Sequence, residues 1–348
     1  MINKLSIKGF KSISDLEINC KKLNLITGMN SSGKSTVLQS ILIAAQNRQS
    51  NVGLNGPYIS VGDFKDAKNF NVAEKLISLD ISFPHNDSVG IVFDQNGVKE
   101  NGFYIQDMKL FGTPEDFLTV SYLSCNRIGA EDIYKKNFAD EKNIGVNGEY
   151  AIYCLDKNKS VNLPQELVKD YNSYTLISQV NYWLNYILNS SITTEDVVGT
   201  DYVKCFYTND QGKQVRPKNT GAGLSYLISI IVMCLLSKKG DIIIIENPEI
   251  HLHPNAQAKV CEFLYFVSNA DRQLFVETHS DHVFNGIRAG IATQTMNGNE
   301  IAVNFFSLDS RNCTKNNVIE FGKRGRILNC VDGLFDQFDI DLNRMLEI

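Results

Sequence analysis

The spacing of hydrophobic and polar positions changes along the chain. At the start, apolar residues alternate with polar ones, as at Leu5 and Ile7 and again over residues 16–18, with a Gly-Phe-Lys turn between the two runs. Alternation is typical of half-buried strands, so the start predicts a β-hairpin. A short apolar strand, 23–26, then leads into a Gly/Ser loop, and the spacing that follows predicts a helix over 36–45.

The texture differs in the middle of the chain. Short alternating runs at 76–83, 89–93 and 103–105 are broken by Asn-Gly and Pro-His-Asn-Asp, which indicates antiparallel strands. From Pro164 to Leu188 the apolar residues keep helical spacing, which predicts a helix that begins at the proline.

After Lys218 the pattern becomes helix, buried strand, helix, strand. The unbroken runs Ile242–Ile245 and Leu274–Val276 predict central parallel strands. We therefore expect an α/β fold with a mostly parallel central sheet. Its core would be built from residues 1–50 and 216–348. The insert 51–215 would have an antiparallel β part, about 51–148, and a helical part, about 160–200.

Composition supports a globular protein and weakens one class of function. The 348 residues are 43% hydrophobic and 21% charged, and 39 acidic residues exceed 34 basic ones, for a net charge of −5. That balance does not favour binding nucleic acid by bulk electrostatics. The insert carries 14 basic and 22 acidic residues, a net of −8, whereas the two flanks together have a net of +3. We expect the acidic insert to contact a protein partner.

Cysteine usage and hydropathy point to the cytoplasm. Eight cysteines are scattered without a Cys-x-x-Cys pair, as expected for reduced thiols rather than disulfides or a zinc site. The longest apolar tract, Leu224–Leu236, is too short to cross a bilayer, and the first residues do not form a signal peptide. We expect a cytoplasmic protein with no membrane partner.

A phosphate-binding loop is the strongest local motif. Residues 28–35, Gly-Met-Asn-Ser-Ser-Gly-Lys-Ser, fit G-x-x-x-x-G-K-[ST] between a predicted strand and helix. The backbone N–H groups would cradle phosphate oxygens, Lys34 would reach the β- and γ-phosphates, and Ser35 would bind Mg²⁺. The alternative is a chance match in a Gly-rich turn. The predicted nucleotide-binding residues are Asn30, Ser31, Ser32, Gly33, Lys34, Ser35 and Thr36.

Two later strands end in polar residues. The strand 242–245 is followed by Glu246-Asn-Pro-Glu249, and the strand 273–277 by Thr-His279-Ser. A carboxylate at the carboxyl end of a core strand can hold Mg²⁺, so Glu246 is the metal candidate beside Ser35. The alternatives are a solvated acidic cluster and a purely structural histidine. Beside a phosphate loop, His279 is well placed to sense the γ-phosphate.

The order of these motifs resembles that of ABC-type ATPases. The phosphate loop is followed by Gly-Ala-Gly-Leu-Ser-Tyr-Leu at 221–227, Glu-Asn-Pro-Glu-Ile-His-Leu-His-Pro at 246–254, and Thr-His-Ser at 278–280. The chain looks closest to the OLD-like branch of the AAA/ABC ATPases, which includes ATPases of bacterial anti-phage systems such as PARIS, Septu and some retrons. The segments 5–12, 122–129 and 332–336 are also similar.

The resemblance implies a head-to-tail homodimer or higher homo-oligomer, with ATP and Mg²⁺ sandwiched between protomers. Gly223 and Ser225 would be signature residues that meet the γ-phosphate held by the partner, and His279 would be the switch histidine. From the residues alone, Gly-x-Gly-x-Ser before an apolar helix could also be a helix cap.

One departure from the family bears on catalysis. ABC-type enzymes usually have Asp-Glu at this strand end, and the Glu acts on the attacking water. Here Glu246 takes the metal position and Asn247 stands where the base would be. An amide cannot accept a proton as a carboxylate does. Either Glu249 takes over or turnover is slow, and we expect weak ATPase activity with switching between ATP states.

OLD-type nucleases carry a C-terminal nuclease domain, and no clustered Asp/Glu motif of that kind follows His279. We therefore expect a sensor or scaffold in prokaryotic antiviral defence that controls a separate effector, a nuclease or toxin. The alternative is a DNA-maintenance ATPase that resembles RecF or SMC heads and binds DNA directly. A transporter subunit fits least, because its signature usually reads Leu-Ser-Gly-Gly-Gln.

Overall fold

The computed structural model describes residues 1–348 except 49, 74, 105–117, 210, 330 and 347–348. The chain forms two compact units. The first comprises Met1–Val120 with Arg288–Ile348, and the second comprises Ser121–Ile287. The predicted core and insert were divided by motif and charge, and that division stays a prediction. Residue 105 of the predicted strand 103–105 and the eighth cysteine, residue 330, lie outside the described residues.

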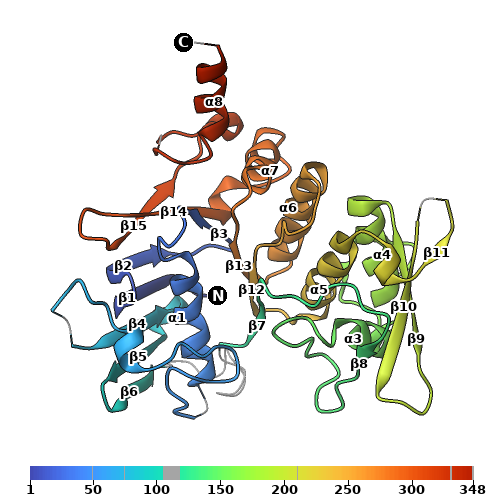
Figure 1. Ribbon diagram of the computed structural model, residues 1–348, viewed down its shortest axis with the longest axis horizontal. Coiled ribbons are helices and arrows are strands. Elements are labelled where there is room, and N and C mark those ends of the chain that lie inside the picture. The colour runs from blue at the N-terminus through green and yellow to red at the C-terminus, as the bar shows by residue number, and fades with distance from the viewer. Residues whose placement is uncertain (49, 74, 105–117, 210, 330, 347–348) are drawn as a thin grey trace. The chain divides into compact units, whose positions relative to one another are not determined.

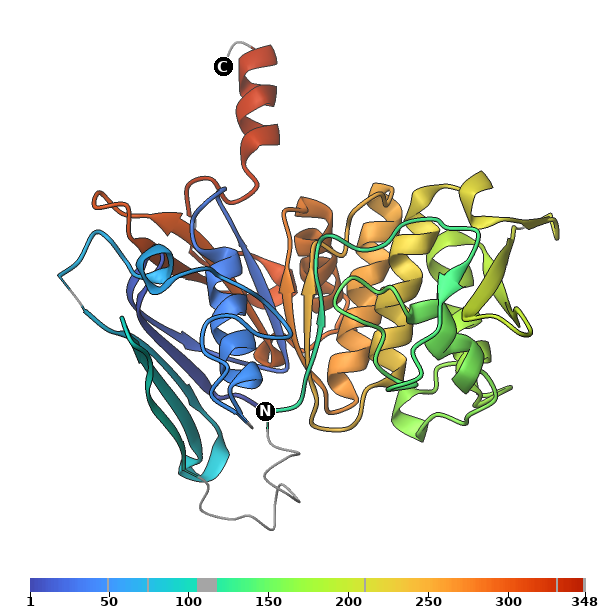
Figure 2. The same cartoon turned by 60° about the horizontal axis from the view of Figure 1, so that its bottom comes forward.

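An antiparallel sheet makes up much of the first unit, in the order β2-β1-β4-β5-β6. The predicted hairpin is confirmed, because Leu5 of β1 pairs with Ile18 of β2 and both side chains are buried. Strand β4 also pairs with β1, so three strands of the predicted insert continue the N-terminal sheet (Figure 2). The strands are β1 (Lys4–Phe10), β2 (Ile13–Asn19), β4 (Ile77–Ser82), β5 (Ser88–Asp94) and β6 (Gly97–Tyr104).

A second set of strands in this unit carries the phosphate loop. Strand β3 (Leu23–Gly28) pairs in parallel with β14 (Ile301–Leu308), which pairs antiparallel with β15 (Thr314–Ile319). Helix α1 (Lys34–Gln46) follows β3 and contacts β1, β3, β4 and β5. Its buried positions include Val37, Leu38, Ile41 and Leu42, as the helical spacing predicts. Helices α2 (Phe64–Ala67) and α8 (Gln337–Met345) also belong to this unit.

The second unit has a parallel pair of strands at its centre. Strands β12 (Ile242–Glu246) and β13 (Gln273–Glu277) pair in parallel, which confirms the prediction, and β7 (Val120–Leu123) lies next to β12. Helix α5 (Ala222–Leu236) precedes β12, and α6 (Pro254–Asn269) connects β12 to β13. Helix α7 (Asp281–Ala292) follows β13 (Figure 1). The α/β fold class is therefore confirmed.

The rest of the second unit is a helical and antiparallel layer. Helix α4 (Leu176–Leu188) packs on α5 and α6, and α3 (Ala151–Asn158) packs on α5. The antiparallel strands are β8 (Tyr134–Lys135), β9 (Ser191–Asp196), β10 (Tyr202–Thr208) and β11 (Gln214–Val215), and β10 pairs with each of the others. Helices thus cover the sheets of this unit, which buries the apolar faces of both, as in other α/β domains.

One helix prediction is wrong at its beginning. Only a single 3₁₀ turn, Gln165–Leu167, follows Pro164, and α4 begins at Leu176. The buried Gln179 amide explains the difference, because it accepts hydrogen bonds from the backbone N–H groups of residues 169 and 170 and donates to the carbonyls of residues 170 and 173. These bonds hold the segment as a loop that still buries Leu167 and Val168, whereas Tyr171 and Tyr174 are exposed.

Two further predictions concern composition. Among the described helices, none combines the length and the apolar character that crossing a bilayer demands. The seven described cysteines are free thiols, and burial raises the pKa of several of them, including Cys205 and Cys261, to about 12. Such thiols are protonated and unreactive at neutral pH.

Candidate functional site

In the phosphate loop of the first unit, side chains of the loop donate hydrogen bonds to backbone carbonyls of the same loop. Lys34 is only 4% exposed, and its Nζ donates to the carbonyl oxygens of Met29 at 2.7 Å and Gly28 at 3.1 Å. The Ser32 hydroxyl also donates to the Met29 carbonyl, at 2.7 Å. Asn30 and Ser31 at the tip are exposed, whereas Ser35 is half-buried and Thr36 is buried. The loop thus places an ammonium group at the start of α1, where the helix dipole also favours an anion.

Gly28 shows why the loop needs glycine. Its φ is +137°, and a Cβ at this position would lie 2.1 Å from the carbonyl oxygen of Phe306 in β14. The same carbonyl accepts the backbone N–H of Met29 at 3.0 Å, so strand and loop are in direct contact. A side chain here would push the loop away from its own sheet.

In the second unit, the Glu246 carboxylate is held at both oxygens. The Tyr122 hydroxyl at the end of β7 donates to Oε1 at 2.8 Å, and the backbone N–H of Cys125 donates to Oε2 at 3.0 Å. Burial and the adjacent Glu246 charge raise the pKa of Tyr122 well above its usual value, so the phenol stays protonated as a donor. Burial and the same charge raise the pKa of Cys125. Glu246 itself is only half-buried, which leaves it accessible to a ligand.

The residues after β12 form a strained turn. Asn247 has φ +46° and His251 has φ +59°, both in the left-handed region, which Asn and His enter more easily than most residues. The Asn247 N–H donates to the Glu277 carbonyl at the end of β13, at 2.8 Å. Asparagine at 247 therefore suits the left-handed backbone of the turn, and it also removes the carboxylate that would act as the base.

In this turn, the Glu249 carboxylate has one oxygen that can still accept a hydrogen bond. Its Oε1 accepts the backbone N–H of His279 at 2.8 Å, which brings two predicted catalytic residues together. Its Oε2 is buried and has no hydrogen-bond partner among the described residues. A buried carboxylate oxygen without a partner is costly unless a ligand or water occupies the place, so this oxygen is the best candidate for contacting an attacking water.

The predicted signature residues differ in their placement. A Cβ on Gly223, in the first turn of α5, would lie 2.7 Å from the His251 carbonyl oxygen, so α5 packs directly on the turn after β12. Ser225 is 4% exposed and its hydroxyl is buried, whereas Gly221 just before α5 is exposed and Ala222 is half-buried. A direct contact between the Ser225 hydroxyl and a nucleotide would require this side chain to leave its buried position.

Three residues at this site had no role in the sequence-based prediction. Tyr122, Cys125 and Arg127 all contact the end of β12, although their segment served only as a point of resemblance. A usable signal was present, because Arg127 is the sole arginine in the acidic stretch 51–215. A lone cation in an apolar segment after a strand suggests a specific partner.

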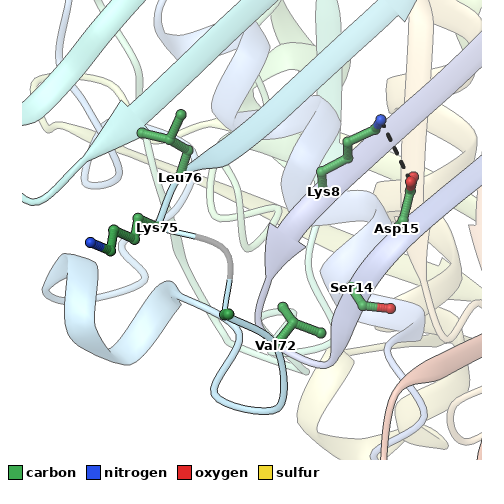
Figure 3. A pocket seen from close by; sticks show the side chains of 7 residues that line it. Lys8, Ser14, Asp15, Val72, Lys75 and Leu76 are labelled. Carbon is green, nitrogen blue, oxygen red and sulfur yellow. Dashed lines mark ion pairs between the residues drawn. The ribbon is translucent and has the colours of Figure 1, made fainter.

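A separate groove lies in the first unit. It has a volume of about 710 Å³ and is lined by residues of β1, β2 and the segment before β4. Lys8 is paired with Asp15, at 3.5 Å; Figure 3 shows Ser14 close to this pair and Lys75 on the opposite side with its amine pointing away. None of the predicted nucleotide-binding residues lines this groove, and one of its two lysines, Lys8, is paired with Asp15.

The sequence matches the family described as the AAA ATPase domain, over residues 1–197 and 166–284. The chain belongs to this family. Its coarse function is therefore that of an ATPase of the AAA/ABC type, as the phosphate loop and strand-end carboxylates predict. The AAA ATPase domain implies the use of a nucleotide and typically Mg²⁺. Comparison with curated proteins finds no match.

Solved structures with the same fold are heads of SMC proteins. An SMC head bound to the C-winged helix domain of ScpA superposes with a TM-score of 0.61 at 14% identity, covering 92% of this chain and 97% of that one. The SMC head domain from Thermotoga maritima gives 0.51 at 12%, with 92% and 99% covered. An SMC head with an extended coiled coil, bound to the C-terminal domain of ScpA derived from Pyrococcus furiosus, gives 0.57 at 11%, with 100% and 99% covered. These likenesses establish the fold.

The residues present fit a nucleotide with its metal. Within the described part of the chain, no group of three His, Cys, Asp or Glu side chains could hold a metal by itself. Mg²⁺ in nucleotide sites uses one or two protein ligands and takes the rest from phosphates and water. In the first unit, the half-buried Ser35 at the start of α1 is a ligand of that kind, and in the second unit the accessible, oriented Glu246 is another.

Proposed function

We propose that this ATPase hydrolyses ATP slowly and uses its ATP-bound and ATP-free states to control a separate effector protein. The observation that carries the first part is the turn after β12, where Asn247 stands in the position of the usual base and Glu249 keeps one buried oxygen without a hydrogen-bond partner in the described chain. Glu249 then accepts the proton of the attacking water less effectively than a carboxylate at 247 would.

The roles of the other residues follow from their surroundings. Lys34 binds the β- and γ-phosphates, with the loop backbone of residues 30–33, of which Asn30 and Ser31 are exposed, around them. Bound Mg²⁺, held by Ser35 and Glu246, would neutralise phosphate charge as hydrolysis proceeds. His279 positions Glu249 through its backbone N–H and senses the γ-phosphate through its side chain.

The catalytic part is tested by steady-state ATP hydrolysis with two variants. We expect a turnover below the roughly 1–10³ s⁻¹ typical of enzymes. Glu249→Gln should remove most of it, and Asn247→Ala should reduce it far less, by no more than the strain of alanine in the left-handed turn. Fast hydrolysis that survives Glu249→Gln and disappears in Asn247→Ala would show that the assignment of the base is wrong.

The effector part rests on the resemblance to anti-phage ATPases and on the acidic segment 51–215. We propose that the chain forms a homodimer or higher homo-oligomer with ATP and that its acidic surface contacts a nuclease or toxin in prokaryotic antiviral defence. The test is native mass determination with ATP and the products of adjacent genes, with Lys34→Ala as control. A solitary protein with no effect on phage infection would count against the proposal.

A second candidate function, DNA maintenance, is favoured by the fold, which is that of SMC heads. A DNA-maintenance ATPase would bind DNA directly, and its affinity would fall steeply with salt. The net charge of −5 opposes this function. A salt-sensitive shift of DNA at nanomolar protein would favour it over the effector-control function.

A further inference from the structure

We propose that Arg127 is a positioning residue for ATP hydrolysis, which fixes the turn after β12 and thereby the carboxylates of Glu246 and Glu249. The proposal rests on the ATPase function proposed above. It concerns a residue that is buried rather than one that touches the nucleotide.

The contacts of Arg127 are almost all with the backbone of this turn. Its Nη1 donates to the carbonyl oxygens of Glu246 at 2.6 Å and Ser124 at 3.1 Å, and its Nη2 donates to the carbonyl oxygen of Asn247. A guanidinium group can bridge consecutive carbonyls because its N–H groups form a rigid planar fork. Lysine has a single point of charge and cannot hold both carbonyls in one geometry.

The same segment also holds the Glu246 side chain. The Tyr122 hydroxyl and the Cys125 backbone N–H each donate to one carboxylate oxygen. Residues 122–127 therefore fix both the main chain and the side chain of Glu246. The left-handed backbone at Asn247 lies in a sparsely populated region, and such a conformation persists only while surrounding contacts of this kind hold it.

Electrostatics explain why a buried cation is tolerated here. Arg127 is 4% exposed, and burial lowers its pKa, while the nearby charges of Glu249 and Glu246 act in the opposite direction. The guanidinium therefore stays charged at neutral pH and draws both carboxylates toward the turn. Removing it would take a hydrogen-bond donor from three carbonyl oxygens and the nearby cation from two carboxylates.

A matched control exists in the same unit. Arg272 is 1% exposed and also donates to backbone carbonyls, those of Ala270 and Ser237, but it precedes β13 and so lies at the opposite end of the strand pair. Arg127→Ala and Arg272→Ala each remove a buried guanidinium. Only the first should affect the turn after β12.

The experiment measures kcat and KM for ATP hydrolysis in Arg127→Ala, Arg127→Lys and Arg272→Ala, with fluorescence of Trp183 as a check of folding. We expect kcat to fall about tenfold to a hundredfold in both Arg127 variants, as displacement of catalytic groups by about 1 Å does. KM should change less than about threefold, because Lys34 and its loop are intact. Added guanidinium ion should restore part of the kcat of Arg127→Ala. Arg272→Ala should keep wild-type kcat.

Two results would overturn the proposal. One is an Arg127→Ala variant with kcat within twofold of wild type, and the other is an equal loss of kcat in Arg272→Ala, which would indicate a general loss of stability. Hydrogen exchange of residues 247–252 separates this proposal from the ATPase proposal. If the wild type hydrolyses no ATP, the function fails, yet loss of protection in Arg127→Ala alone still supports Arg127 as the residue that holds the turn, and unchanged protection refutes it.

Discussion

Replacing Gly223 by alanine tests whether the start of α5 and the turn after β12 move as one body. The added Cβ would lie 2.7 Å from the His251 carbonyl oxygen and 3.0 Å from Leu252 Cδ2. The first neighbour is backbone, so rotation of a side chain cannot relieve the contact. The Tyr226 ring also lies on the His251 ring, with centroids 4.9 Å apart, so the turn cannot withdraw without breaking a second contact.

The net cost follows from two opposing effects. Inserting a methyl group into a packed position costs about 1–3 kcal/mol, and a backbone clash belongs in the upper part of that range. Alanine gains at most about 1 kcal/mol over glycine in a helix, and less in the first turn. We therefore expect Gly223→Ala to lower the free energy of unfolding of the second unit by about 1–2 kcal/mol. A displaced turn should also reduce kcat for ATP hydrolysis by about tenfold.

Gly221→Ala is the matched control. It lies two residues earlier, has φ −63°, and a Cβ there would have open space around it. Gly221 is the N-cap of α5, so we expect Gly221→Ala to lose only the preference for glycine over alanine at an N-cap, about 0.5–1 kcal/mol. Urea unfolding followed by Trp183, the single tryptophan, reports on the second unit, because this residue is 3% exposed and packs on Phe263. If both variants have the same stability and kcat, α5 and the turn are not coupled as argued.

Three further predictions use single substitutions. Lys34→Ala should abolish ATP binding measured by calorimetry, because its ammonium is the loop's cation, whereas Lys8→Ala, in the groove of Figure 3, should bind ATP as wild type does. Gly28→Ala should cost more than about 3 kcal/mol in the first unit or prevent folding, since its Cβ would overlap the Phe306 carbonyl; soluble protein with a wild-type melting temperature would contradict this. Asn247→Asp, which tolerates a left-handed backbone, should raise kcat severalfold if a missing carboxylate limits turnover, and an unchanged kcat would place the limit elsewhere.

Local patterns predicted much of the fold. The alternation at Leu5 and Ile7, the phosphate loop and the buried run Ile242–Ile245 were placed in the elements that the structure contains, because strand and helix periods reflect which side is buried. The helix predicted from Pro164 failed for a reason that no pattern contains. A single buried amide, Gln179, competes for the backbone hydrogen bonds of residues 169–173.

The site was predictable only where chemistry depends on a motif. Lys34 and Glu246 were predicted as site residues from their sequence context, whereas Tyr122 and Arg127 reach Glu246 from about 120 positions away in sequence. Pairing between β7 and β12 brings them together, and strand order is a long-range property that local spacing does not encode. The burial of Ser225 could not be predicted for the same reason, because the helical spacing of residues does not show which neighbouring element covers each face of the helix.

The turn after β12 receives three independent contacts within the second unit. Arg127 binds its first carbonyls, Gly223 lies against the His251 carbonyl, and the His279 N–H binds the Glu249 carboxylate. Each contact comes from a different element, so displacement of any one element changes the position of the same carboxylates. A side chain that meets a ligand near the start of α5 would therefore alter Glu249 without touching it. If a ligand meets the start of α5, as the proposed function requires, its effect would reach Glu249 through these shared contacts, because the left-handed turn persists only while its surroundings hold it.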